Sequence, residues 1–250
     1  MSDEDDVGHE GHEGEPAHYD LQVHTDASPC SLATPEMVVE AAVAAGLDGI
    51  AVTNHDTTEG VEAARAAAPE ELDVLSGVEV TTTGGHLLAL GVETPPPRTD
   101  PLSAVDAIQE QGGVAVLSHP FDRLREHFEP SSRLAEAVDA VEAVNSRCLR
   151  DVYNDRARAF AARYDLPVTG GSDAHFPMEV GRAYTVCAGD PIRAIREGRT
   201  ETGGRGRYLS GHVATKLLTN PVVGRALPDH LVLTFADATG RDSANRPVER

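Results

Sequence analysis

Short apolar runs alternate with alanine-rich helical stretches along most of the chain. Apolar runs bounded by Gly, Pro and polar residues predict strands at residues 19–24, 48–53, 72–80, 86–92, 114–119, 138–144, 167–169 and 183–187. Helical periodicity and end signals predict helices at residues 35–46, 58–68, 102–111, 149–164 and 191–197. Repeated strand–helix alternation is typical of an α/β fold with a mostly parallel sheet, and over this length it favours a closed barrel over an open sheet.

The ends of the predicted elements carry local signals. Thr34 can cap the helix at residues 35–46, Pro35 suits its first turn and Gly46 suits its end. Four prolines make residues 94–101 a loop. We find no internal repeat and no break in the middle of the chain.

The two ends of the chain differ from its body. Residues 1–18 are acidic and glycine-rich and predict a disordered tail. Residues 19–200 form the main domain. Gly and Arg accumulate near residues 199–206, so we expect residues 201–238 to be an appended helical segment and residues 239–250 a second loose tail.

The amino-acid composition restricts which partners the protein is expected to bind. The net charge is −20, from 41 acidic and 21 basic residues, which repels nucleic acid and anionic membranes at long range. A metal site can reverse the sign locally, so nucleic acid remains open as a substrate. Lys216 is the only lysine, and this acidic, arginine-based composition predicts a salt-adapted protein. At molar salt the Debye length is about 3 Å, which screens the self-repulsion.

The cysteines and the apolar runs indicate the cellular location that we expect. Cys30, Cys148 and Cys187 are far apart and form no CxxC pair, which argues against a disulfide scaffold. No apolar run is long enough to span a membrane, and the acidic start does not resemble a signal peptide. We therefore expect a cytoplasmic protein with no membrane partner. The sequence does not indicate an oligomeric state.

Polar residues that can bind metal recur where the predicted strands end. Asp20, Gln22 and His24 alternate, so we expect them on one face of the first strand. The other strand ends carry Asn54, His55, Asp56, Glu79, His86, His119, Asp173 and His175. In a β/α barrel the carboxyl ends of the strands meet at one rim, where catalysis occurs.

Each of these residues alone also has a structural explanation. A single strand-end histidine is commonly a hydrogen-bonded core or surface residue, and Asp56 can equally cap the next helix. Together, several histidines and carboxylates at one rim would be costly to pack without a cation. Imidazole and carboxylate are the ligands of Zn, Mn or Fe, so the pattern predicts a metal site.

Five motifs in order resemble the polymerase and histidinol phosphatase (PHP) family. They are Asp20–Thr25, Thr53–Asp56, Glu79, Ser118–Pro120 and Gly171–His175, and residues 190–198 resemble a segment that often follows this domain. The resemblance implies a distorted seven-stranded, TIM-like β/α barrel with two or three divalent metals, Mn, Zn or Fe.

The resemblance also implies ligand roles. His24, Glu79 and Asp173 would hold one metal. Glu79 would bridge to a second metal held by His119, and His86 matches a histidine of some members. His55 and His175 would hold a third metal or supply the proton for the leaving group, and Arg123 and Arg182 would bind phosphate oxygens.

Two departures from the family pattern stand out. Gln22 occupies the position of a metal-binding histidine, where it offers a carbonyl oxygen. Pro29 and Cys30 occupy a region that often holds an acidic ligand, with Asp26 the nearest carboxylate; Cys30 is either a thiolate ligand or a buried free cysteine. We therefore expect two metals around Glu79 and leave the third open.

The expected activity is hydrolysis of a phosphate monoester or small phosphodiester by a metal-bridging hydroxide. One alternative is a nuclease acting on nucleic-acid ends or RNA, which the acidic charge and few aromatic residues disfavour. Another is a degenerate metal-binding regulatory module, which Gln22 would suit. We expect the rim loops at residues 94–101, 121–132 and 145–150. In and directly after these loops lie Arg123, Arg125, Arg133 and Arg147, which suit a small anionic substrate.

Overall fold

A computed structural model describes residues 15–125 and 130–206. The strands are β1 (Pro16–Val23), β2 (Gly49–Val52), β3 (Asp73–Thr82), β4 (Gly85–Leu90), β5 (Val114–Leu117), β6 (Ala140–Asn145), β7 (Val168–Gly171), β8 (Ala183–Ala188) and β9 (Glu201–Gly204). The helices are α1 (Pro35–Ala45), α2 (Val61–Ala67), α3 (Pro101–Glu110), α4 (Ser132–Ala135), α5 (Asp151–Tyr164) and α6 (Pro191–Arg196), with a short 3₁₀ helix η1 (Pro177–Glu179).

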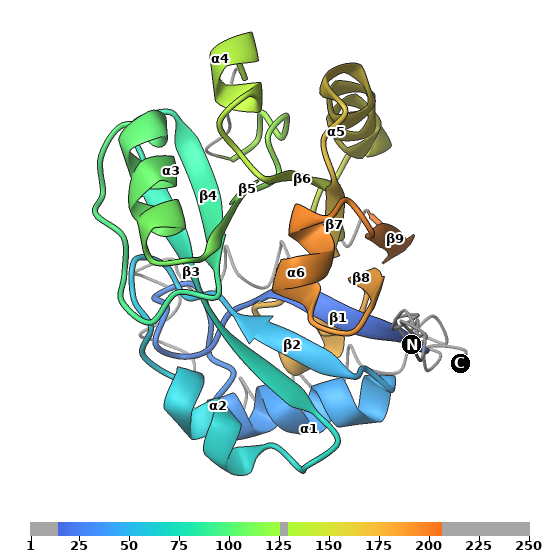
Figure 1. The fold of residues 1–250 in the computed structure, drawn as a ribbon. Helices are drawn as coiled ribbons and strands as arrows, with labels where there is room; N and C mark the ends of the chain where they lie inside the picture. Colours follow the sequence, from blue (N-terminus) through green and yellow to red (C-terminus); the bar gives the residue numbers. More distant parts are fainter. Residues whose placement is uncertain (1–14, 126–129, 207–250) are drawn as a thin grey trace, which may run out of the picture.

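The strands form one sheet in the order β7-β6-β5-β4-β3-β2-β1-β8-β9. The pairs β1–β2, β2–β3, β5–β6 and β6–β7 are parallel, whereas β3–β4, β4–β5, β1–β8 and β8–β9 are antiparallel. The sheet curls into a nearly closed barrel, since Val23 bridges to Ala174 just beyond β7. Figure 1 shows the strands arranged around the centre of the molecule.

The expected seven-stranded barrel is wrong in its strand count, because the sheet has nine strands. The reason is that β1 changes partner along its length. Its first residues, Pro16–Tyr19, pair with β8, while the carbonyl of Gln22 accepts a hydrogen bond from the N–H of Asp173, which follows β7. The antiparallel strands β8 and β9 therefore extend the sheet beyond the point where it curls to meet itself.

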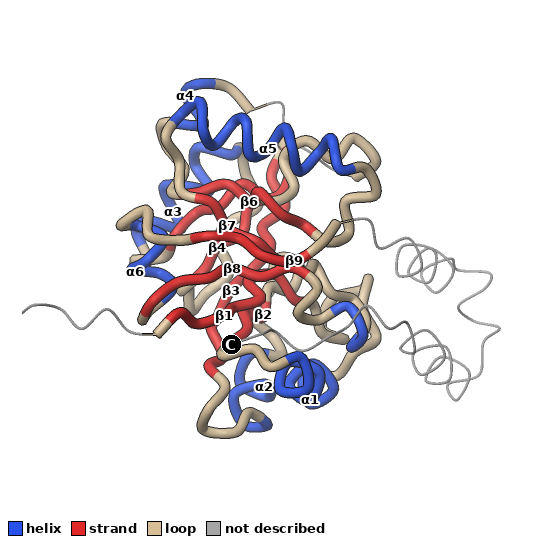
Figure 2. The backbone as a smooth tube through the Cα atoms, turned by 90° about the vertical axis from the view of Figure 1, so that its right-hand side faces the viewer, coloured by secondary structure: helices blue, strands red, loops and turns tan. Residues whose placement is uncertain are grey.

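Buried apolar side chains form three clusters. Leu21, Leu88 and Val116 belong to an inner cluster that includes Ile195 of α6. A second cluster joins strands β3–β6 to helices α3, α4 and α5, and a third joins β1 and β2 to α1 and α2. Figure 2 shows the helices outside the strands, with α1 and α2 on the side opposite α4 and α5. Helices α1 to α5 thus bury the outer face of the barrel, whereas α6 packs against the inner cluster.

A β-bulge in β1 changes which side chains face inward. The pairing register with β2 shifts between Asp20 and Val23. Leu21 packs in the inner cluster, whereas Val23 packs in the cluster with α1 and α2. Strict alternation would put both on one face, so the expectation that Asp20, Gln22 and His24 share a face is wrong for Asp20. Its carboxylate instead accepts hydrogen bonds from the backbone N–H groups of Ser172 and Gly181.

Several predicted boundaries are confirmed and others change. Thr34 caps α1, and Gly46 ends it in the left-handed conformation (φ 73°). Residues 16–18, assigned to the leading tail, are part of β1, and residues 201–204, assigned to a helical segment, form β9. The rest of the two tails, residues 1–14 and 207–250, lies outside the described residues.

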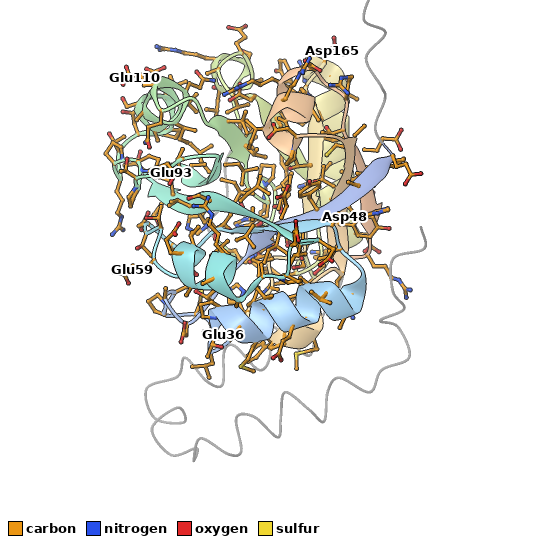
Figure 3. All side chains as sticks on the ribbon, turned by 60° about the horizontal axis from the view of Figure 1, so that its bottom comes forward. Glu36, Asp48, Glu59, Glu93, Glu110 and Asp165 are labelled. Carbon is orange, nitrogen blue, oxygen red and sulfur yellow. The ribbon has the colours of Figure 1, made fainter. Side chains whose placement is uncertain are left out.

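The surface is strongly acidic, and Figure 3 labels acidic residues around the periphery of the molecule. Glu36 on α1, Glu110 on α3, and Glu59 and Glu93 in loops are all exposed. Among the described residues, none of the helices has the length and hydropathy needed to cross a membrane.

Gly170 provides a test of the contact between β7 and β8. A methyl group on Gly170 would lie 2.6 Å from the carbonyl oxygen of Tyr184, which is a backbone atom that cannot rotate away. We expect Gly170→Ala to lower the free energy of unfolding by about 1–3 kcal/mol, measured by urea denaturation. Without a clash, Gly→Ala would stabilise the protein by about 0.4–1 kcal/mol, so a rise in stability would contradict this packing.

Candidate metal centre

One rim of the barrel brings together the predicted metal-binding side chains: His24, His55, Glu79, His86, His119, Asp173 and His175. His24 directly follows β1, and Asp173 lies two residues after β7. His86 reaches the same rim from the beginning of its strand. Because β4 runs antiparallel to β3, its first residues lie beside the last residues of β3.

Glu79 is the centre of the cluster. Its Oε2 lies 3.2 Å from Nε2 of His24 and 3.5 Å from Nδ1 of His55. Its Oε1 lies 3.2 Å from Nδ1 of His86 and 3.1 Å from Nε2 of His119. Burial alone would raise the pKa of this carboxyl, but His55, His86 and the other imidazoles outweigh burial and hold the pKa well below its ordinary value. Glu79 is therefore ionised and can bridge two cations.

Asp173 is the second buried carboxylate. Its Oδ1 lies 3.3 Å from Nε2 of His24, and its Oδ2 is bound by Arg125 and by the amide of Asn145. Burial would raise the pKa of Asp173, but Arg125, His24 and His175 hold it well below its ordinary value. Glu79 and Asp173 thus place two negative charges around one imidazole.

The surroundings of His24 favour a positive charge at or next to its Nε2. Its Nε2 is buried between the carboxylates of Glu79 and Asp173, yet no hydrogen bond of ordinary geometry reaches it within the described chain. Burial lowers the pKa of His24, but Cys30, Asp173 and Glu79 outweigh burial and raise the pKa well above its ordinary value. Either a proton on Nε2 or a divalent cation meets this need, so the donor set fits a metal.

Three overlapping groups of side chains have ligand atoms within 4.8 Å of one another. They are His24–Asp173–His175, His55–Glu79–His86 and His24–Cys30–His55. Asp26, the nearest carboxylate to the first motif, is exposed. A chain of nitrogen, oxygen and sulfur donors therefore runs along the rim.

Comparison with known sequences matches this arrangement to one family. A model of the PHP domain matches residues 20–153, more than half of the chain, and a model described as PHP-associated matches residues 152–200. This chain belongs to the PHP domain family.

Three relatives illustrate the range of proteins that this chain resembles. An uncharacterised protein of Methanocaldococcus jannaschii is 33% identical over 66% of this chain and 68% of its own length. The 3',5'-nucleoside bisphosphate phosphatase of Chromobacterium violaceum is 38% identical over 90% of this chain and 75% of its own length. A 5'-3' exoribonuclease of Haemophilus influenzae is 34% identical, but over only 39% of this chain and 38% of its own length.

Solved structures share the fold. A Bacteroides vulgatus two-domain protein containing a predicted PHP-like metal-dependent phosphoesterase aligns with a TM-score of 0.67 and 20% identity, over 78% of this chain and 66% of that chain. Endonuclease Q of Pyrococcus furiosus aligns with a TM-score of 0.57 and 17% identity, over 75% of this chain and 57% of that chain. This chain thus shares its fold with both of these structures.

Gln22, predicted as a metal ligand, lies in a hydrogen-bond network beside the cluster. Its Nε2 donates to Oγ of Ser118 at 3.2 Å, and its Oε1 accepts from Nδ2 of Asn145 at 3.2 Å. Ser118 in turn donates to Oε1 of Glu79 at 3.2 Å. In this structure Gln22 supports Glu79 through Ser118, which is a positioning contact.

Glu142 is a buried carboxyl that the sequence analysis missed. Its Oε2 accepts from the backbone N–H of His119 at 2.7 Å and from Asn145 at 3.0 Å. Burial and the charge of Asp173 raise its pKa well above the ordinary value. The available signal was an acidic residue inside the apolar run at residues 138–144.

The arginine that enters the site differs from those expected. Arg123 is exposed, whereas Arg125 bonds Asp173, Asp122 and Asn145. Arg182 lies between η1 and β8, where its backbone N–H donates to the carbonyl of Glu179. Arg125 is therefore the cationic side chain that we connect to the cluster. Sequence reasoning placed it in the correct loop but could not tell it from Arg123.

A buried ion pair holds the loop that carries His175. Arg147 donates from Nη1 to both carboxylate oxygens of Glu179, at 2.6 and 2.8 Å. Oε2 of Glu179 accepts the backbone N–H groups of His175 and Phe176. Nδ1 of His175 lies 2.8 Å from the carbonyl oxygen of Asp173, and a carbonyl can only accept, so Nδ1 carries the proton. Burial and Arg147 hold the pKa of His175 well below its ordinary value, which leaves Nε2 free to bind a cation.

Strained backbone is concentrated at this rim. Among the described residues, four other than glycine have positive φ, and three of them are Asp56 (55°), His119 (30°) and Asp173 (56°). The side chain of Asp56 accepts from the N–H of Thr81, which excludes the helix-capping role considered for it, since α2 begins at Val61. Such strain persists where surrounding contacts hold the backbone in place.

The Arg147–Glu179 pair can be tested by removing one partner. We expect Arg147→Met to lower the free energy of unfolding by about 3–5 kcal/mol, because it leaves a buried carboxylate without its cation. The control is Arg158→Met, which removes an exposed pair with Asp155 and should cost at most about 1 kcal/mol. Urea denaturation measures both, and equal effects would contradict the structural role of the buried pair.

Proposed function

We propose that the protein hydrolyses a small phosphate monoester or phosphodiester with the help of divalent metal ions. The observation that carries this proposal is the buried carboxylate of Glu79, with four imidazoles within 3.5 Å. A carboxylate shared by so many nitrogen donors is suited to bridging two cations.

The side chains divide into ligand sets around Glu79. His24 and Asp173 would hold one ion with Glu79. His119 and His86 would hold a second ion from the other carboxylate oxygen, and His55 and His175 would hold a third. Mn, Zn or Fe suits these donors. Bound ions would supply an activated water and neutralise charge on the phosphate.

Arg125 is our candidate for binding the phosphate. Its Nε is held by Asp122 at 2.9 Å, so the guanidinium stays at the rim. Its Nη1 bonds Asp173, a proposed metal ligand. When a cation takes over the charge of Asp173, the guanidinium can turn its donors to phosphate oxygens.

In the two-metal case, in which no third ion binds it, His55 is our candidate for proton transfer to the leaving group. Its side chain is 26% exposed, whereas that of His175 is 9% exposed and bound through Nδ1. Burial lowers the pKa of His55, so it is largely neutral at pH 7 and must take a proton before it can donate one. His175 then serves as a ligand.

A small substrate is favoured over nucleic acid. The net charge of −20 opposes polyanion binding, and the bisphosphate phosphatase matches 90% of the chain, against 39% for the exoribonuclease of Haemophilus influenzae. We therefore propose that the substrate is a small phosphorylated molecule, of the kind that the name of the phosphatase describes. Salt adaptation and a cytoplasmic location remain predictions.

The central test is hydrolysis of a panel of phosphate esters with added Mn, Zn or Fe. We expect turnover that a chelator abolishes. Glu79→Gln should lower kcat/KM by more than about 100-fold, because the bridging charge is lost. Glu93→Gln, at an exposed position, is the matched control.

Three results would contradict the proposal in different ways. No turnover with any metal, together with an inert His119→Ala change, would exclude hydrolysis at this site. Fewer than two bound ions and no activity would indicate a degenerate regulatory module. Preferential cleavage of single-stranded RNA, with salt-dependent binding, would indicate a nuclease.

Arg125 and Arg123 provide a matched pair in one loop. We expect Arg125→Ala to raise KM by about 10–100-fold, since a charge-assisted hydrogen bond is worth about 1.5–3 kcal/mol. Arg123→Ala should leave KM nearly unchanged, because its side chain is exposed. Steady-state kinetics on the best substrate measures both, and the reverse ranking would assign the phosphate to Arg123.

A further inference from the structure

Cys30 lies in a tightly bonded loop between β1 and α1. The N–H of Ser28 donates to the carbonyl of Thr25 at 2.9 Å, and the N–H of Ser31 donates to the carbonyl of Ser28 at 3.1 Å. Across the loop, the N–H of Asp26 donates to the carbonyl of Ala33 at 2.8 Å. The backbone on both sides of Cys30 is therefore held in place.

The serines flanking Cys30 tie this loop to three histidine segments. Oγ of Ser28 accepts the backbone N–H of His55 at 2.9 Å and lies 3.3 Å from Nδ1 of His24. Oγ of Ser31 donates to the carbonyls of His24 and His175, at 3.2 and 2.9 Å. Cys30 is thus fixed next to the metal centre by contacts independent of its own side chain.

The sulfur of Cys30 belongs to a group of donors. His24, Cys30 and His55 each offer a ligand atom, and these atoms all lie within 4.8 Å of one another. His24 adds a second indication, because its fully buried Nε2 has no hydrogen bond of ordinary geometry within the described chain. The other two cysteines have different surroundings: Cys148 contacts Arg125, and Cys187 contacts the carbonyl of Gly189.

We propose that Cys30 is a metal ligand, so that its thiolate joins His24 and His55 in a sulfur-containing part of the metal centre. Binding forms a metal–sulfur bond and releases the thiol proton to solvent. The thiolate supplies a negative charge in a segment that otherwise lacks a buried carboxylate, since Asp26 is exposed. Sulfur with imidazole favours Zn over Mn at this position. The inference rests on the proposed metal centre and adds a donor to it.

Cobalt substitution tests the sulfur ligand directly. Protein stripped of metal and loaded with Co²⁺ should show thiolate-to-cobalt charge-transfer absorption in the near ultraviolet. Cys30→Ser should abolish this absorption and weaken Zn binding by at least about 100-fold, whereas Cys187→Ser should change neither. Cys30→His should bind the same number of ions as the natural protein but lack the absorption.

A measurement on the natural protein covers the case in which the variants do not fold. Cys30 should react with iodoacetamide in stripped protein and be protected by added Zn, as read by peptide mass, while Cys187 reacts equally in both. Bound cobalt without charge-transfer absorption would overturn the role of Cys30 and leave the hydrolase proposal standing. No cobalt binding at all would overturn both.

Discussion

Burial of negative charge at the rim is the constraint on which the structure depends. Glu79 and Asp173 are ionised carboxylates with almost no exposure, and they meet at Nε2 of His24. The free energy of burying an isolated ionised carboxylate would be prohibitively high. Imidazoles and Arg125 therefore surround Glu79 and Asp173. The amides of Gln22 and Asn145 surround these groups without adding charge, and burial raises the pKa of the neighbouring Glu142 carboxyl well above its ordinary value. The whole rim is thus arranged to hold positive charge.

Irregular features of the sheet bring the side chains of the cluster together. The bulge in β1 turns Asp20 away to bind the backbone near β7 and lets His24 face Glu79. The antiparallel strand β4 brings His86 to the rim from its first residues. Positive φ at His119 and Asp173 aims side chains that a regular strand end would point elsewhere. Regular barrel geometry alone would not assemble the cluster.

The sequence predicted the histidine and carboxylate cluster because its members follow apolar runs and fall into family motifs. It could not predict that Asp20 leaves the cluster, since a bulge is invisible to a period-two pattern. It also could not separate Arg125 from Arg123, because that choice depends on how a loop turns. A strand at residues 183–187 was expected, but its antiparallel pairing with β1 joins segments far apart in the chain, and the Arg147–Glu179 pair is recognised only by its burial.

The change of partner along β1 has a consequence for how the molecule forms. His24 and Asp173 are separated by most of the domain, yet the backbone bonds Asp173 N–Gln22 O and His24 N–Ala174 O hold their segments together. Such distant pairings give a high contact order and cost chain entropy before they stabilise anything. The first ligand made on the ribosome must therefore wait for nearly the last strand of the barrel. Metal binding can then stabilise the native state only after these distant segments have paired. The availability of metal ions would therefore affect the yield of native protein.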